Sequence, residues 1–554
     1  MKLALRSLLV LVLASMEGAC HESNGSSSLP TGTSNLGSEP ITIRLEDGVL
    51  ATEIVEVAVD RNGDGDSGDT LLEIVDLRTG RRELVPNVGI GFSQTVGLGG
   101  GFVSFAVPEA AEGRDLNGDG DQDDQVLHVH DARRGSTRNL QLAVALSGLF
   151  SVEQDGALVA FGVAESEQGA DLDGDGLLNS VQAFVHEADR GRTTQLGLHI
   201  SSRLHLSSQS PIMAGRRVVL VAEESTSGDL NGDGDAVDHV LHVYDADAAG
   251  LQNFGLAVER VVVEGSMLAF VTCECEHGES SPEGSPDLNG NGIAGDSFVV
   301  LHDLESGSSR MTPLPPAGIW VGGDLALLRL ENGGSPAEIF AYDRFGDALF
   351  ELGPLAFVFF EPALVDRRAA FAVDELAAGQ DLDGDGELLD TVLHTFDART
   401  GALHSSDRAT FSPAEIDGHF AVFQALPAPS SVRPPPSTTL VAENLQSGEV
   451  QELDLPASAF HFESGRIAAV TPEAWRGADL NGDLDLLDSV VQVHDLATGV
   501  TTNTGLAVLV SDTPIVLELE GDFLAFLVPE QDQGTDLNGD QDRLDAVLHV
   551  VRLR

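Results

Sequence analysis

Lysine is nearly absent from this sequence, and cysteine is scarce. Lys2 is the only lysine, and Cys20, Cys273 and Cys275 are the only cysteines among 554 residues. Beyond Lys2 the chain therefore cannot form a Schiff base through a lysine amine or hold a phosphate group with an ammonium. So few thiols agree with a protein that is exported into an oxidising compartment.

Basic residues are also few. The chain has 30 Lys and Arg against 89 Asp and Glu, which gives a formal net charge of -59 at pH 7. A surface of this sign repels phosphate groups, so nucleic acid is excluded as a partner. A halophilic surface is the alternative explanation for this composition.

Familiar catalytic motifs and long apolar stretches are missing as well. The sequence contains no G-x-S-x-G elbow, no H-E-x-x-H helix and no Walker loop. After the N-terminal segment, no apolar stretch has the length that a membrane-spanning helix needs. We therefore assign no catalytic residue and expect the chain not to be an enzyme.

Eight copies of one aspartate-rich loop are the dominant feature that is present. The clearest copies are DLNGDGDQDD from Asp115, DLNGDGDAVD from Asp229 and DLDGDGELLD from Asp381. Oxygen-bearing side chains at loop positions 1, 3 and 5 match the first half of the calcium loop of EF-hands. A tight turn points alternate side chains into one concavity, where Ca²⁺ can collect about six to eight oxygen ligands. The repetition predicts up to eight Ca²⁺ sites.

The predicted metal ligands fall into five sets. Position 1 of the loops carries Asp60, Asp115, Asp171, Asp229, Asp287, Asp381, Asp479 and Asp536. Position 3 carries Asn62, Asn117, Asp173, Asn231, Asn289, Asp383, Asn481 and Asn538. Position 5 carries Asp64, Asp119, Asp175, Asp233, Asn291, Asp385, Asp483 and Asp540. Position 10 carries Asp69, Asp124, Asp238, Asp296, Asp390, Asp488 and Asp545. A glutamate six residues before position 1 recurs as Glu109, Glu165, Glu223, Glu375, Glu473 and Glu530.

The loops depart from EF-hands at their ends. An EF-hand closes its site with a Glu at position 12, but that position is mostly apolar here, as in Val126 and Val490. We infer that the position-10 Asp or the upstream Glu closes the coordination sphere. The alternative for this Glu is a solvated residue at a strand end. The third loop has Ser180 at position 10 and the fifth has Asn291 at position 5, so these two sites should be the weakest. Position 4 is glycine in every loop, which predicts a positive φ there.

The spacing of the loops predicts the architecture. Their first aspartates are separated by 55, 56, 58, 58, 94, 98 and 57 residues, and the two long gaps contain units without the loop near Leu325 and His419. Each unit has four apolar segments bounded by Gly and Asp turns, without convincing helical periodicity. The predicted fold is all-β, a β-propeller of about ten four-stranded units over residues 39–554. The acidic loop joins the second and third strands. One ring is favoured over two smaller propellers.

Two strand patterns accompany the loops. An apolar run ending in Phe precedes the loop, as in LVAF at Leu158 and FLAF at Phe523, and VLHVYD at Val240 and VVQVHD at Val490 follow it. These patterns resemble the TolB-like branch of WD40-type β-propellers over nearly all of residues 39–554. The DLNGDG core is also similar to the FG-GAP repeats of integrin-type propellers. In those repeats, however, the closing acid lies one residue earlier and the loop precedes a different strand. Both resemblances imply a propeller.

The two ends of the predicted propeller complement each other. The chain ends with VLHVVRLR, which reads as a third strand without a fourth. The segment TGTSNLG from Thr31 resembles the fourth-strand segment TGVTTNTGL from Thr498. An N-terminal strand is therefore expected to complete the last unit and to cover its open edge.

Residues 1–19 resemble an export signal peptide. Two basic residues precede a short apolar core, which is too short to span a bilayer, and small residues precede Cys20. Cys20 and the flexible tether over residues 20–38 resemble a bacterial lipoprotein anchor, although Glu17 stands where such signals usually have Leu. Simple cleavage is the alternative. The chain is expected to be a lipoprotein of the outer membrane or cell surface, or to be periplasmic or secreted.

Sulfur and imidazole groups offer two further candidate sites. Cys273, Cys275 and His277 form C-E-C-E-H before the fifth loop. A local disulfide is the first interpretation, because a soft-metal site would need a fourth ligand. Histidines recur in the third strands, where packing between units explains them better than catalysis: His128, His242, His302, His394 and His549.

Two classes of function remain. The favoured one is an exported calcium-binding propeller that serves as a scaffold for a protein or glycan partner, with membrane contact only through a lipid at Cys20. The alternative is a calcium-dependent propeller hydrolase or lyase with its site in the central channel. Equivalent units favour the scaffold, because a catalytic site requires one unit to differ. We expect neighbouring ions to bind nearly independently, with the loops at Asp115, Asp229 and Asp381 filling first.

Overall fold

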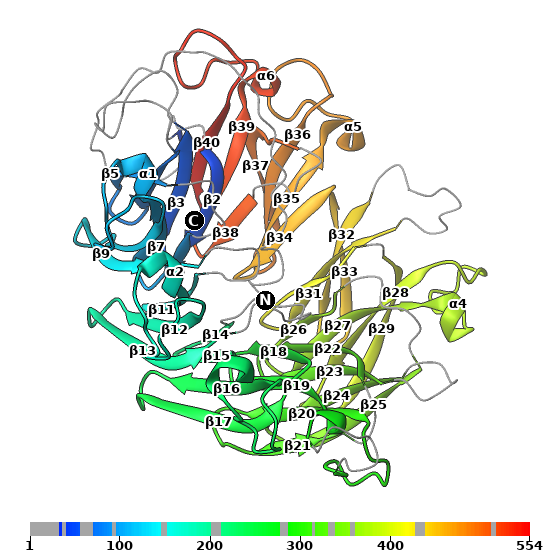
Figure 1. Cartoon of the computed structure of the whole chain (residues 1–554). Coiled ribbons are helices and arrows are strands. Elements are labelled where there is room, and N and C mark those ends of the chain that lie inside the picture. Colours follow the sequence, from blue (N-terminus) through cyan, green and yellow to red (C-terminus); the bar gives the residue numbers. More distant parts are fainter. Residues whose placement is uncertain are drawn as a thin grey trace. The chain divides into compact units, whose positions relative to one another are not determined.

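Ten four-stranded antiparallel sheets make up the computed structural model of this chain (Figure 1). The structure describes residues 33–35, 40–55, 70–90, 96–145, 152–200, 212–277, 286–312, 316–330, 338–354, 361–410, 412–426, 438–510 and 517–553. Three expected features lie outside the described residues: the signal peptide, Cys20, and the first loop with Asp60, Asn62, Asp64 and Asp69.

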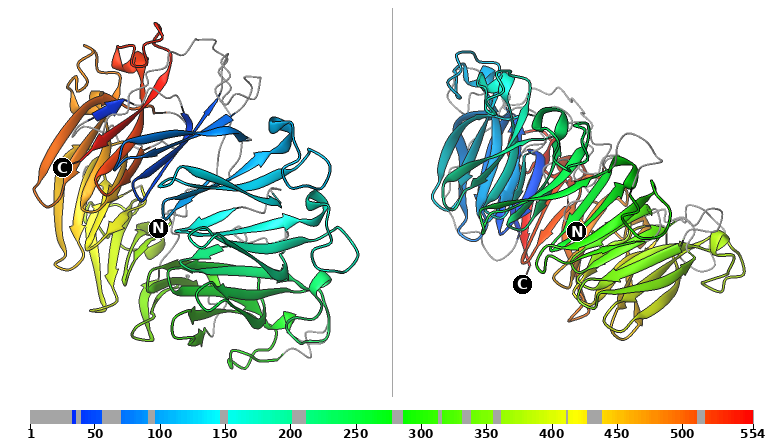
Figure 2. Two further views of the ribbon diagram at one scale, coloured as in Figure 1. Left: turned by 90° about the vertical axis from the view of Figure 1, so that its left-hand side faces the viewer. Right: turned by 60° about the horizontal axis from the view of Figure 1, so that its bottom comes forward.

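Each sheet corresponds to one repeat unit, and we number these blades 1 to 10 in chain order. In nine blades the four strands follow one another along the chain. Figure 2 shows the antiparallel strands of individual blades side by side. The prediction of an all-β β-propeller with ten four-stranded units is confirmed, including blades 6 and 8, whose sequences lack the acidic loop.

The strands of the first five blades are as follows. Blade 1 contains β2 (Pro40–Glu46), β3 (Val49–Val55), β4 (Thr70–Asp76) and β5 (Arg81–Ile90). Blade 2 contains β6 (Gly97–Gly99), β7 (Phe102–Pro108), β8 (Gln125–Asp131) and β9 (Ser136–Ala143). Blade 3 contains β10 (Glu153–Asp155), β11 (Leu158–Ala164), β12 (Val181–Glu187) and β13 (Arg192–His199). Blade 4 contains β14 (Ile212–Ala214), β15 (Arg217–Glu223), β16 (His239–Asp245) and β17 (Gly250–Ala257). Blade 5 contains β18 (Arg260–Glu264), β19 (Met267–Cys273), β20 (Ser297–Asp303) and β21 (Ser309–Met311).

The remaining blades have the same order. Blade 6 contains β22 (Pro316–Gly322), β23 (Leu325–Leu330), β24 (Glu338–Asp343) and β25 (Ala348–Pro354). Blade 7 contains β26 (Ala363–Val365), β27 (Arg368–Asp374), β28 (Thr391–Asp397) and β29 (Ala402–Ala409). Blade 8 contains β30 (Glu415–Asp417), β31 (Phe420–Ala425), β32 (Thr439–Asn444) and β33 (Glu449–Pro456). Blade 9 contains β34 (Ala459–Glu463), β35 (Arg466–Pro472), β36 (Ser489–Asp495) and β37 (Val500–Ala507). Blade 10 contains β38 (Leu517–Glu520), β39 (Phe523–Pro529), β40 (Ala546–Arg552) and β1 (Thr33–Asn35).

Strand β1 confirms the predicted completion of the last blade. It pairs antiparallel with β40, placing Thr33 opposite Val551 and Asn35 opposite His549. The first described strand of the chain therefore covers the edge that β40 would otherwise leave open.

A single helical turn follows the second strand in seven blades. These turns were not predicted, because three or four residues are too few for a helical periodicity to appear. They are α1 (Glu109–Glu112), α2 (Glu165–Gln168), α3 (Glu224–Ser227), the 3₁₀ turn η1 (Glu274–Glu276), α4 (Glu375–Ala378), α5 (Glu473–Arg476) and α6 (Glu530–Gln533). Among the described residues, no helix has the length and apolar character needed to cross a membrane.

The chain divides into two compact units. Unit 1 comprises Met1–Arg61, Val75–Arg82 and Ser335–Arg554, and unit 2 comprises Asn62–Ile74 and Glu83–Gly334. Within unit 1, first strands of successive blades contact one another in the series β26, β30, β34, β38 and β2. Within unit 2, the corresponding series is β6, β10, β14, β18 and β22. Successive blades in each unit therefore pack side by side.

Apolar side chains fill the space between successive blades. In unit 1, Val493 of blade 9 belongs to the same buried cluster as Phe526 of blade 10. In unit 2, Val185 of blade 3 shares a buried cluster with Leu220 of blade 4. Strands covered on both faces need apolar residues on both faces, which explains their continuous apolar runs. The acidic segments are left for the ends of the blades.

Candidate metal centres in the acidic loops

Seven of the eight acidic loops lie within the described residues. Each follows the helical turn after the second strand and leads into the third strand, in blades 2, 3, 4, 5, 7, 9 and 10. This is the predicted location. The third strand begins at loop position 11, so the apolar residue at position 12, such as Val490 in β36, is part of the buried core. The EF-hand glutamate therefore has no counterpart at this position.

The loop that opens at Asp479 illustrates how the backbone turns its side chains inward. The Asp479 carboxylate accepts the backbone N–H groups of Gly482 at 2.6 Å and Leu484 at 3.0 Å. Asn481 Oδ1 accepts the backbone N–H of Asp483 at 3.1 Å. Asp483 Oδ1 in turn accepts the backbone N–H of Asp485 at 3.0 Å. Such side chain-to-backbone turns form locally and hold several oxygen atoms on the inside of one bend.

Two backbone positions in this loop have a positive φ. Gly482 at position 4 has a φ of 88°, and the positive φ predicted for this glycine is confirmed in all seven described loops. Position 6 is also left-handed and is usually glycine, but Leu484 and Gln541 occupy it with φ of 84° and 83°. A residue with a side chain is disfavoured there by about 1 to 2 kcal/mol.

A buried glutamate lies beneath each described loop. Glu473 Oε1 accepts the backbone N–H groups of Leu480 and Asn481, the second at 3.3 Å. Equivalent bonds to loop positions 2 and 3 are made by Glu109, Glu165, Glu224, Glu274, Glu375, Glu473 and Glu530. All seven residues are 0% exposed. The alternative of a solvated strand end is therefore wrong for five of the six predicted glutamates: Glu109, Glu165, Glu375, Glu473 and Glu530.

Two of these glutamates differ from the prediction. In blade 4 the residue is Glu224 and not Glu223, because the connection to the loop is one residue shorter. Glu223 ends β15 and accepts a hydrogen bond from Ser225 Oγ at 2.9 Å. In blade 5 the residue is Glu274, which was missed because an insertion separates it from its loop. Its place directly after the second strand is the signal that could have identified both.

The second oxygen of the buried glutamates distinguishes two kinds of loop. In Glu165, Oε2 accepts the backbone N–H of Ser180 at 3.1 Å, so both oxygens hold the backbone. The same holds in blades 4, 5 and 7. In Glu109, Glu473 and Glu530, Oε2 is buried and has no hydrogen-bond partner among the described residues. A buried carboxylate oxygen without a donor is costly unless a cation contacts it.

Carboxylate oxygens converge beside the buried glutamate. In blade 9, one oxygen from each of Glu473, Asp483, Asp485 and Asp488 lies within 4.8 Å of the others. Blade 10 repeats this set with Glu530, Asp540, Asp542 and Asp545, and smaller groups occur in blades 2, 3 and 4. Position 7 contributes carboxylates that the sequence analysis missed, because an EF-hand uses a backbone carbonyl there: Asp121, Asp235, Asp485 and Asp542.

The other predicted ligands have different surroundings. Position-1 aspartates use their oxygens for the backbone N–H groups of positions 4 and 6, as Asp479 does. Asparagines at position 3 donate from Nδ2 to the position-10 aspartate: Asn117 to Asp124 (2.7 Å), Asn231 to Asp238 (2.7 Å), Asn289 to Asp296 (3.3 Å), Asn481 to Asp488 (3.2 Å) and Asn538 to Asp545 (3.0 Å). In blades 9 and 10 the structure therefore brings positions 5, 7 and 10 together with the buried glutamate, in blades 2 and 4 positions 7 and 10, and in blade 3 positions 1 and 3.

Burial, together with nearby carboxyl groups, perturbs the position-10 aspartates. Burial, with neighbouring carboxyl groups, raises the pKa of Asp124, Asp238 and Asp488 to about 7 in each case. A hydrogen bond from the position-3 asparagine opposes this effect in all three. A divalent cation among these oxygens would remove the repulsion that favours the protonated form.

Side chains of the fourth strand fix the loop from the other side. Asn503 Nδ2 in β37 donates to the carbonyl oxygen of Leu480 at loop position 2, at 2.8 Å. The same bond is made in blades 2, 3 and 4 by Asn139, Gln195 and Asn253. Loop position 2 is thus held through both its N–H and its carbonyl group, which limits its freedom before any ion binds.

The third loop is poor in available carboxylates. Ser180 Oγ and Gln182 Nε2 donate to Asp173 Oδ2, at 3.3 Å and 3.0 Å. Burial alone would raise the pKa of Glu165, but the backbone N–H groups of Leu172 and others lower it below its ordinary value. Protein donors thus already satisfy oxygens that an ion would need. Weak binding at the loop that opens at Asp171 stays a prediction.

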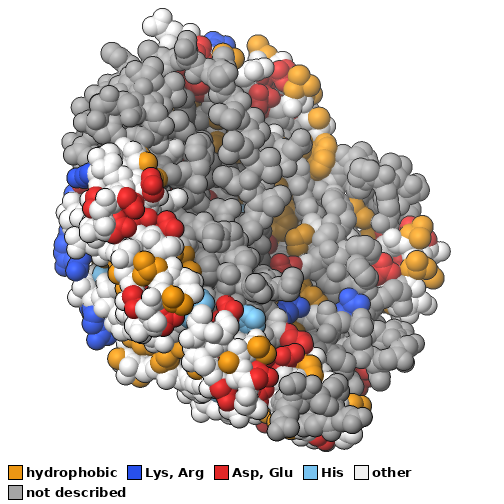
Figure 3. Space-filling model, viewed as in Figure 1, with side chains coloured by type: hydrophobic (Ala, Val, Ile, Leu, Met, Phe, Trp, Pro, Cys, Tyr) orange, Lys and Arg blue, Asp and Glu red, His pale blue; other side chains and the backbone are white. Residues whose placement is uncertain are grey.

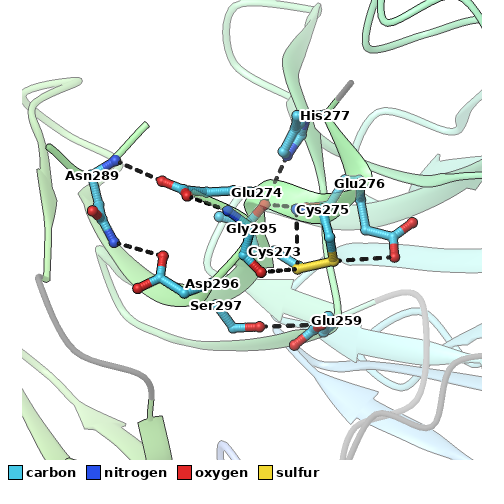
Figure 4. The surroundings of a disulfide bond; sticks show 12 residues. Glu259, Cys273, Glu274, Cys275, Glu276, His277, Asn289, Gly295, Asp296 and Ser297 are labelled. Carbon is cyan, nitrogen blue, oxygen red and sulfur yellow. Dashed lines mark hydrogen bonds between the residues drawn. A yellow bond between two sulfur atoms is a disulfide. The ribbon is translucent and has the colours of Figure 1, made fainter. Parts of the chain in front are cut away.

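The fifth loop is held mainly by amides (Figure 4). Figure 4 shows Glu274 accepting the backbone N–H groups of Asn289 and Gly295, at 3.2 Å and 2.9 Å, beside the Asn289–Asp296 bond. Asn291 Nδ2 also donates to Asp296 Oδ2 at 2.7 Å. With asparagine at positions 3 and 5, this loop offers an ion fewer charged oxygens than the others.

A disulfide joins Cys273 and Cys275 on either side of Glu274 (Figure 4). His277 Nε2 lies 2.9 Å from Thr272 Oγ1, so this imidazole is used in the local structure and not in a sulfur-ligated metal site. The disulfide occupies the turn that cradles the fifth loop.

The third-strand histidines are core residues. His128 Nδ1 lies 3.0 Å from the Val126 carbonyl oxygen, and its ring stacks on Phe105 with centroids 5.9 Å apart. In four other third-strand histidines Nδ1 lies beside a Ser or Thr hydroxyl group of the fourth strand: His130, His186, His302 and His494. His302 belongs to this set and not to the set of His128. Burial lowers the pKa of His128 and His186 to about 4, so both are neutral at pH 7.

Acidic and apolar side chains lie side by side at the surface of the loops. Figure 3 shows red and orange side chains next to each other around α4 and α6, as located in Figure 1. Among the residues that the structure describes, nine of the sixteen exposed large hydrophobic residues stand at loop positions 6 to 9: Leu177, Leu178, Val237, Ile293, Leu389, Leu484, Leu486, Leu487 and Leu544. The loops thus present apolar groups next to their carboxylates.

No protein-family model matches this sequence, and no curated protein matches it. Among solved structures, the chain is similar to the β-propeller domain of the Trilobed protease from Pyrococcus furiosus, with 12% identity over 65% of this chain and 96% of that chain and a TM-score of 0.29. It is similar to TolB from Acinetobacter baumannii, with 10% identity over 64% of this chain and 79% of that chain and a TM-score of 0.21. It is also similar to the tricorn protease, with 12% identity over 89% of this chain and 47% of that chain and a TM-score of 0.23.

Proposed function

We propose that this chain is an exported calcium-binding β-propeller that serves as a scaffold for a binding partner. One observation carries the proposal. In blades 2, 9 and 10 a fully buried glutamate keeps one oxygen without a hydrogen-bond donor among the described residues, beside two or three further carboxylates. Burying such an oxygen is unfavourable, and a divalent cation offsets that cost directly.

The donor set fits calcium. In blade 9 the ion would be held by Glu473 Oε2 and by oxygens of Asp483, Asp485 and Asp488. The side-chain oxygen of Asn481 would be a neutral ligand. These are hard oxygen ligands on a turn, which suits the flexible, high coordination of Ca²⁺ better than the strict octahedron of Mg²⁺. When bound, Ca²⁺ would supply charge neutralisation and a crosslink between the two ends of the loop. The loops at Asp171 and Asp287 should bind most weakly.

The scaffold role is supported by the apolar residues on the loops. Leu484 and Leu487 are 90% and 88% exposed, and they flank the carboxylates of blade 9. Before calcium binds, the negative charge of the loop opposes the approach of an acidic or apolar partner. Once the charge is neutralised, the same leucines become a surface that a protein or the apolar face of a glycan can cover. Partner binding should therefore require calcium.

Export is part of the proposal and rests on the sequence. The N-terminal segment has the pattern of a signal peptide, and Cys20 has the setting of a lipid-modified cysteine. Extracellular calcium modules bind with dissociation constants of about 0.1 to 1 mM, which suits exposed loops of this kind outside the cell. A surface-anchored or periplasmic location would expose all the loops to calcium.

Isothermal titration calorimetry of the EGTA-stripped protein tests the proposal. We expect Ca²⁺ to bind at several sites per chain and Mg²⁺ to bind more weakly. The strongest sites should be those of blades 2, 9 and 10, in place of the order expected from the sequence, because the second oxygens of Glu224 and Glu375 beneath the loops at Asp229 and Asp381 already accept backbone N–H groups. A glycan and protein array probed with and without Ca²⁺ then identifies the partner. Absence of any calcium binding at millimolar concentrations would refute the metal-dependent function.

A further inference from the structure

We propose that the calcium sites of blades 2 and 9 are each completed by a carboxylate from the next blade, so that calcium joins neighbouring blades. The two carboxylates belong to Glu167 and Asp532. The inference rests on the proposed function, because it assigns further ligands to the same loops. It lies within one unit in each case: blades 2 to 3 in unit 2, and blades 9 to 10 in unit 1.

The helical turn of one blade lies against the acidic loop of the preceding blade. Asn481 Nδ2, at loop position 3 of blade 9, donates to the carbonyl oxygen of Asp532 in α6 at 2.8 Å. The same bond recurs from Asn117 to Glu167 (3.0 Å) and from Asn231 to Glu276 (3.4 Å). In every case the accepting residue is the acid two positions after the buried glutamate of its own blade. The repeat therefore delivers an acid to the neighbouring loop.

Two further contacts fix this turn on the preceding blade. Gln533 Oε1 in α6 accepts the backbone N–H of Ala507 in β37 at 2.8 Å. Close packing adds to this in blades 2 and 3, where a Cβ at Gly169 would come within 2.9 Å of Asp119 Cβ. The turn is thus positioned by contacts to both the loop and the fourth strand of its neighbour, and the backbone of its acidic residue is fixed beside the neighbouring loop.

Asp532 lies beside the site of blade 9. Asn481 Nδ2 donates both to the carbonyl oxygen of Asp532 at 2.8 Å and to the position-10 carboxylate of Asp488 at 3.2 Å. Asn117 Nδ2 links the carbonyl oxygen of Glu167 to the Asp124 carboxylate of blade 2 in the same way. An acid placed among like charges is unfavourable without a cation between them.

An independent observation points to a cation at both sites. Glu473 beneath the blade 9 loop and Glu109 beneath the blade 2 loop are 0% exposed, and Oε2 of each has no hydrogen-bond partner among the described residues. Both side chains belong to the carboxylate groups of those loops. With the acid of the next blade, the blade 9 site has five carboxylates, a set that one Ca²⁺ can accommodate.

Blade 3 provides a natural contrast. The residue two positions after Glu224 in blade 4 is Thr226, so this position offers the preceding loop at Asp171 a hydroxyl group in place of a carboxylate. Calcium should therefore crosslink some blade pairs and not others. Binding at a crosslinked site would also depend on how the next blade is positioned, which departs from the expectation that all loops fill independently.

Terbium luminescence can test the blade 9 site specifically. The chain has two tryptophans, Trp320 and Trp475, and the second lies in α5, four residues before Asp479. In a full-length Trp320→Phe background, terbium luminescence excited through the indole reports on this loop, and Trp475→Phe should abolish it. We expect Asp532→Asn to lower the terbium and calcium affinity of this site by about tenfold or more.

Control variants separate this effect from a change in folding. Asp189→Asn removes an exposed acid in the turn after β12, outside every loop, and should leave the affinity unchanged. Asp532→Asn should unfold at the same temperature as the parent protein in EGTA. Thr226→Glu should raise the affinity of the weak loop at Asp171, a gain that misfolding cannot produce.

The outcomes for the two proposals are distinguishable. If the parent protein binds neither terbium nor calcium, the proposed function fails and this inference fails with it. If the parent protein binds calcium but Asp532→Asn and Glu167→Gln bind it with unchanged affinity, the crosslink between blades is refuted while the calcium function stands. A selective loss at the blade 9 site with intact folding supports the crosslink.

Discussion

Replacing the buried glutamates by glutamine separates their structural role from their role toward calcium. Glutamine keeps the size of the side chain and one oxygen atom, but an amide nitrogen takes the place of the second oxygen. In Glu165→Gln this nitrogen faces the backbone N–H of Ser180, so a hydrogen bond is lost and two donors oppose each other. In Glu473→Gln it replaces an oxygen that has no hydrogen-bond partner among the described residues, and the N–H groups of Leu480 and Asn481 keep their acceptor.

The expected magnitudes follow from these contacts. Without calcium, Glu165→Gln should lower the free energy of unfolding by about 3 kcal/mol, the upper range for losing a hydrogen bond to a charged acceptor. Glu473→Gln should cost only about 1 kcal/mol, because its bonds weaken but persist. Free calcium at about 100 times the dissociation constant adds about 2.7 kcal/mol per site. The loss in Glu473→Gln should therefore grow to about 4 kcal/mol, while that in Glu165→Gln stays near 3 kcal/mol.

Urea denaturation of both variants, in EGTA and in calcium, measures these four values. Calorimetry should also register one strong site fewer in Glu473→Gln and the same strong sites in Glu165→Gln. The reasoning is refuted if Glu473→Gln loses the same stability in EGTA as in calcium, since the buried oxygen would then have no part in metal binding.

Three other predictions concern stability. Chelation with EDTA should lower the melting temperature in scanning calorimetry, because each bound ion stabilises the folded chain by mass action; an unchanged melting temperature would contradict calcium binding. Leu484→Gly should raise the free energy of unfolding in EGTA by about 1 kcal/mol, because it removes a side chain from a residue with a φ of 84°. If urea denaturation shows no such gain, the leucine side chain causes no strain at this position. The pKa of His186 is lowered to about 4 by burial, so the unfolded chain binds more protons, and stability present above pH 6.5 is lost as the pH falls toward 4. This amounts to about 2 kcal/mol at pH 5, and His186→Asn should reduce the difference between pH 7 and pH 5 by that amount in EGTA.

The blades could be predicted from the sequence because their information is local and repeated. Apolar runs of strand length, Gly and Asp turns and a constant period are sufficient to define four strands per unit and ten units. The conformation of the acidic loops could be predicted for the same reason. The bonds that Asp479 and Asn481 make inside their loop reach only two to five residues along the chain. Residue type and spacing therefore decide whether such a turn forms.

The buried glutamates were only partly predictable. Their recurrence revealed a role, but Glu223 was chosen where Glu224 is used, and Glu274 was missed. The prediction chose each glutamate by its distance from the loop along the sequence. In the structure the buried glutamate is instead the residue directly after the second strand. That position is kept when the connection to the loop is shorter, as for Glu224, or contains an insertion, as for Glu274. Burial decides which carboxylate lies beneath the loop, and burial depends on the strand end and on the third strand together. The Oε2 atom of Glu473 likewise differs from that of Glu165 because no N–H group of the described residues donates to it.

The carboxylates contributed by the next blade could not be predicted at all. Glu167 and Asp532 look like ordinary exposed acids in a polar segment, and they lie 50 and 51 residues after the loop asparagines that they contact. Only the packing of one blade on another brings them to a neighbouring loop. The sequence by itself therefore determines the blades and the turn of each loop, because strands and turns depend on contacts between near neighbours. Tertiary structure decides which oxygens are buried and which blade supplies the remaining charge, because both depend on packing between distant segments.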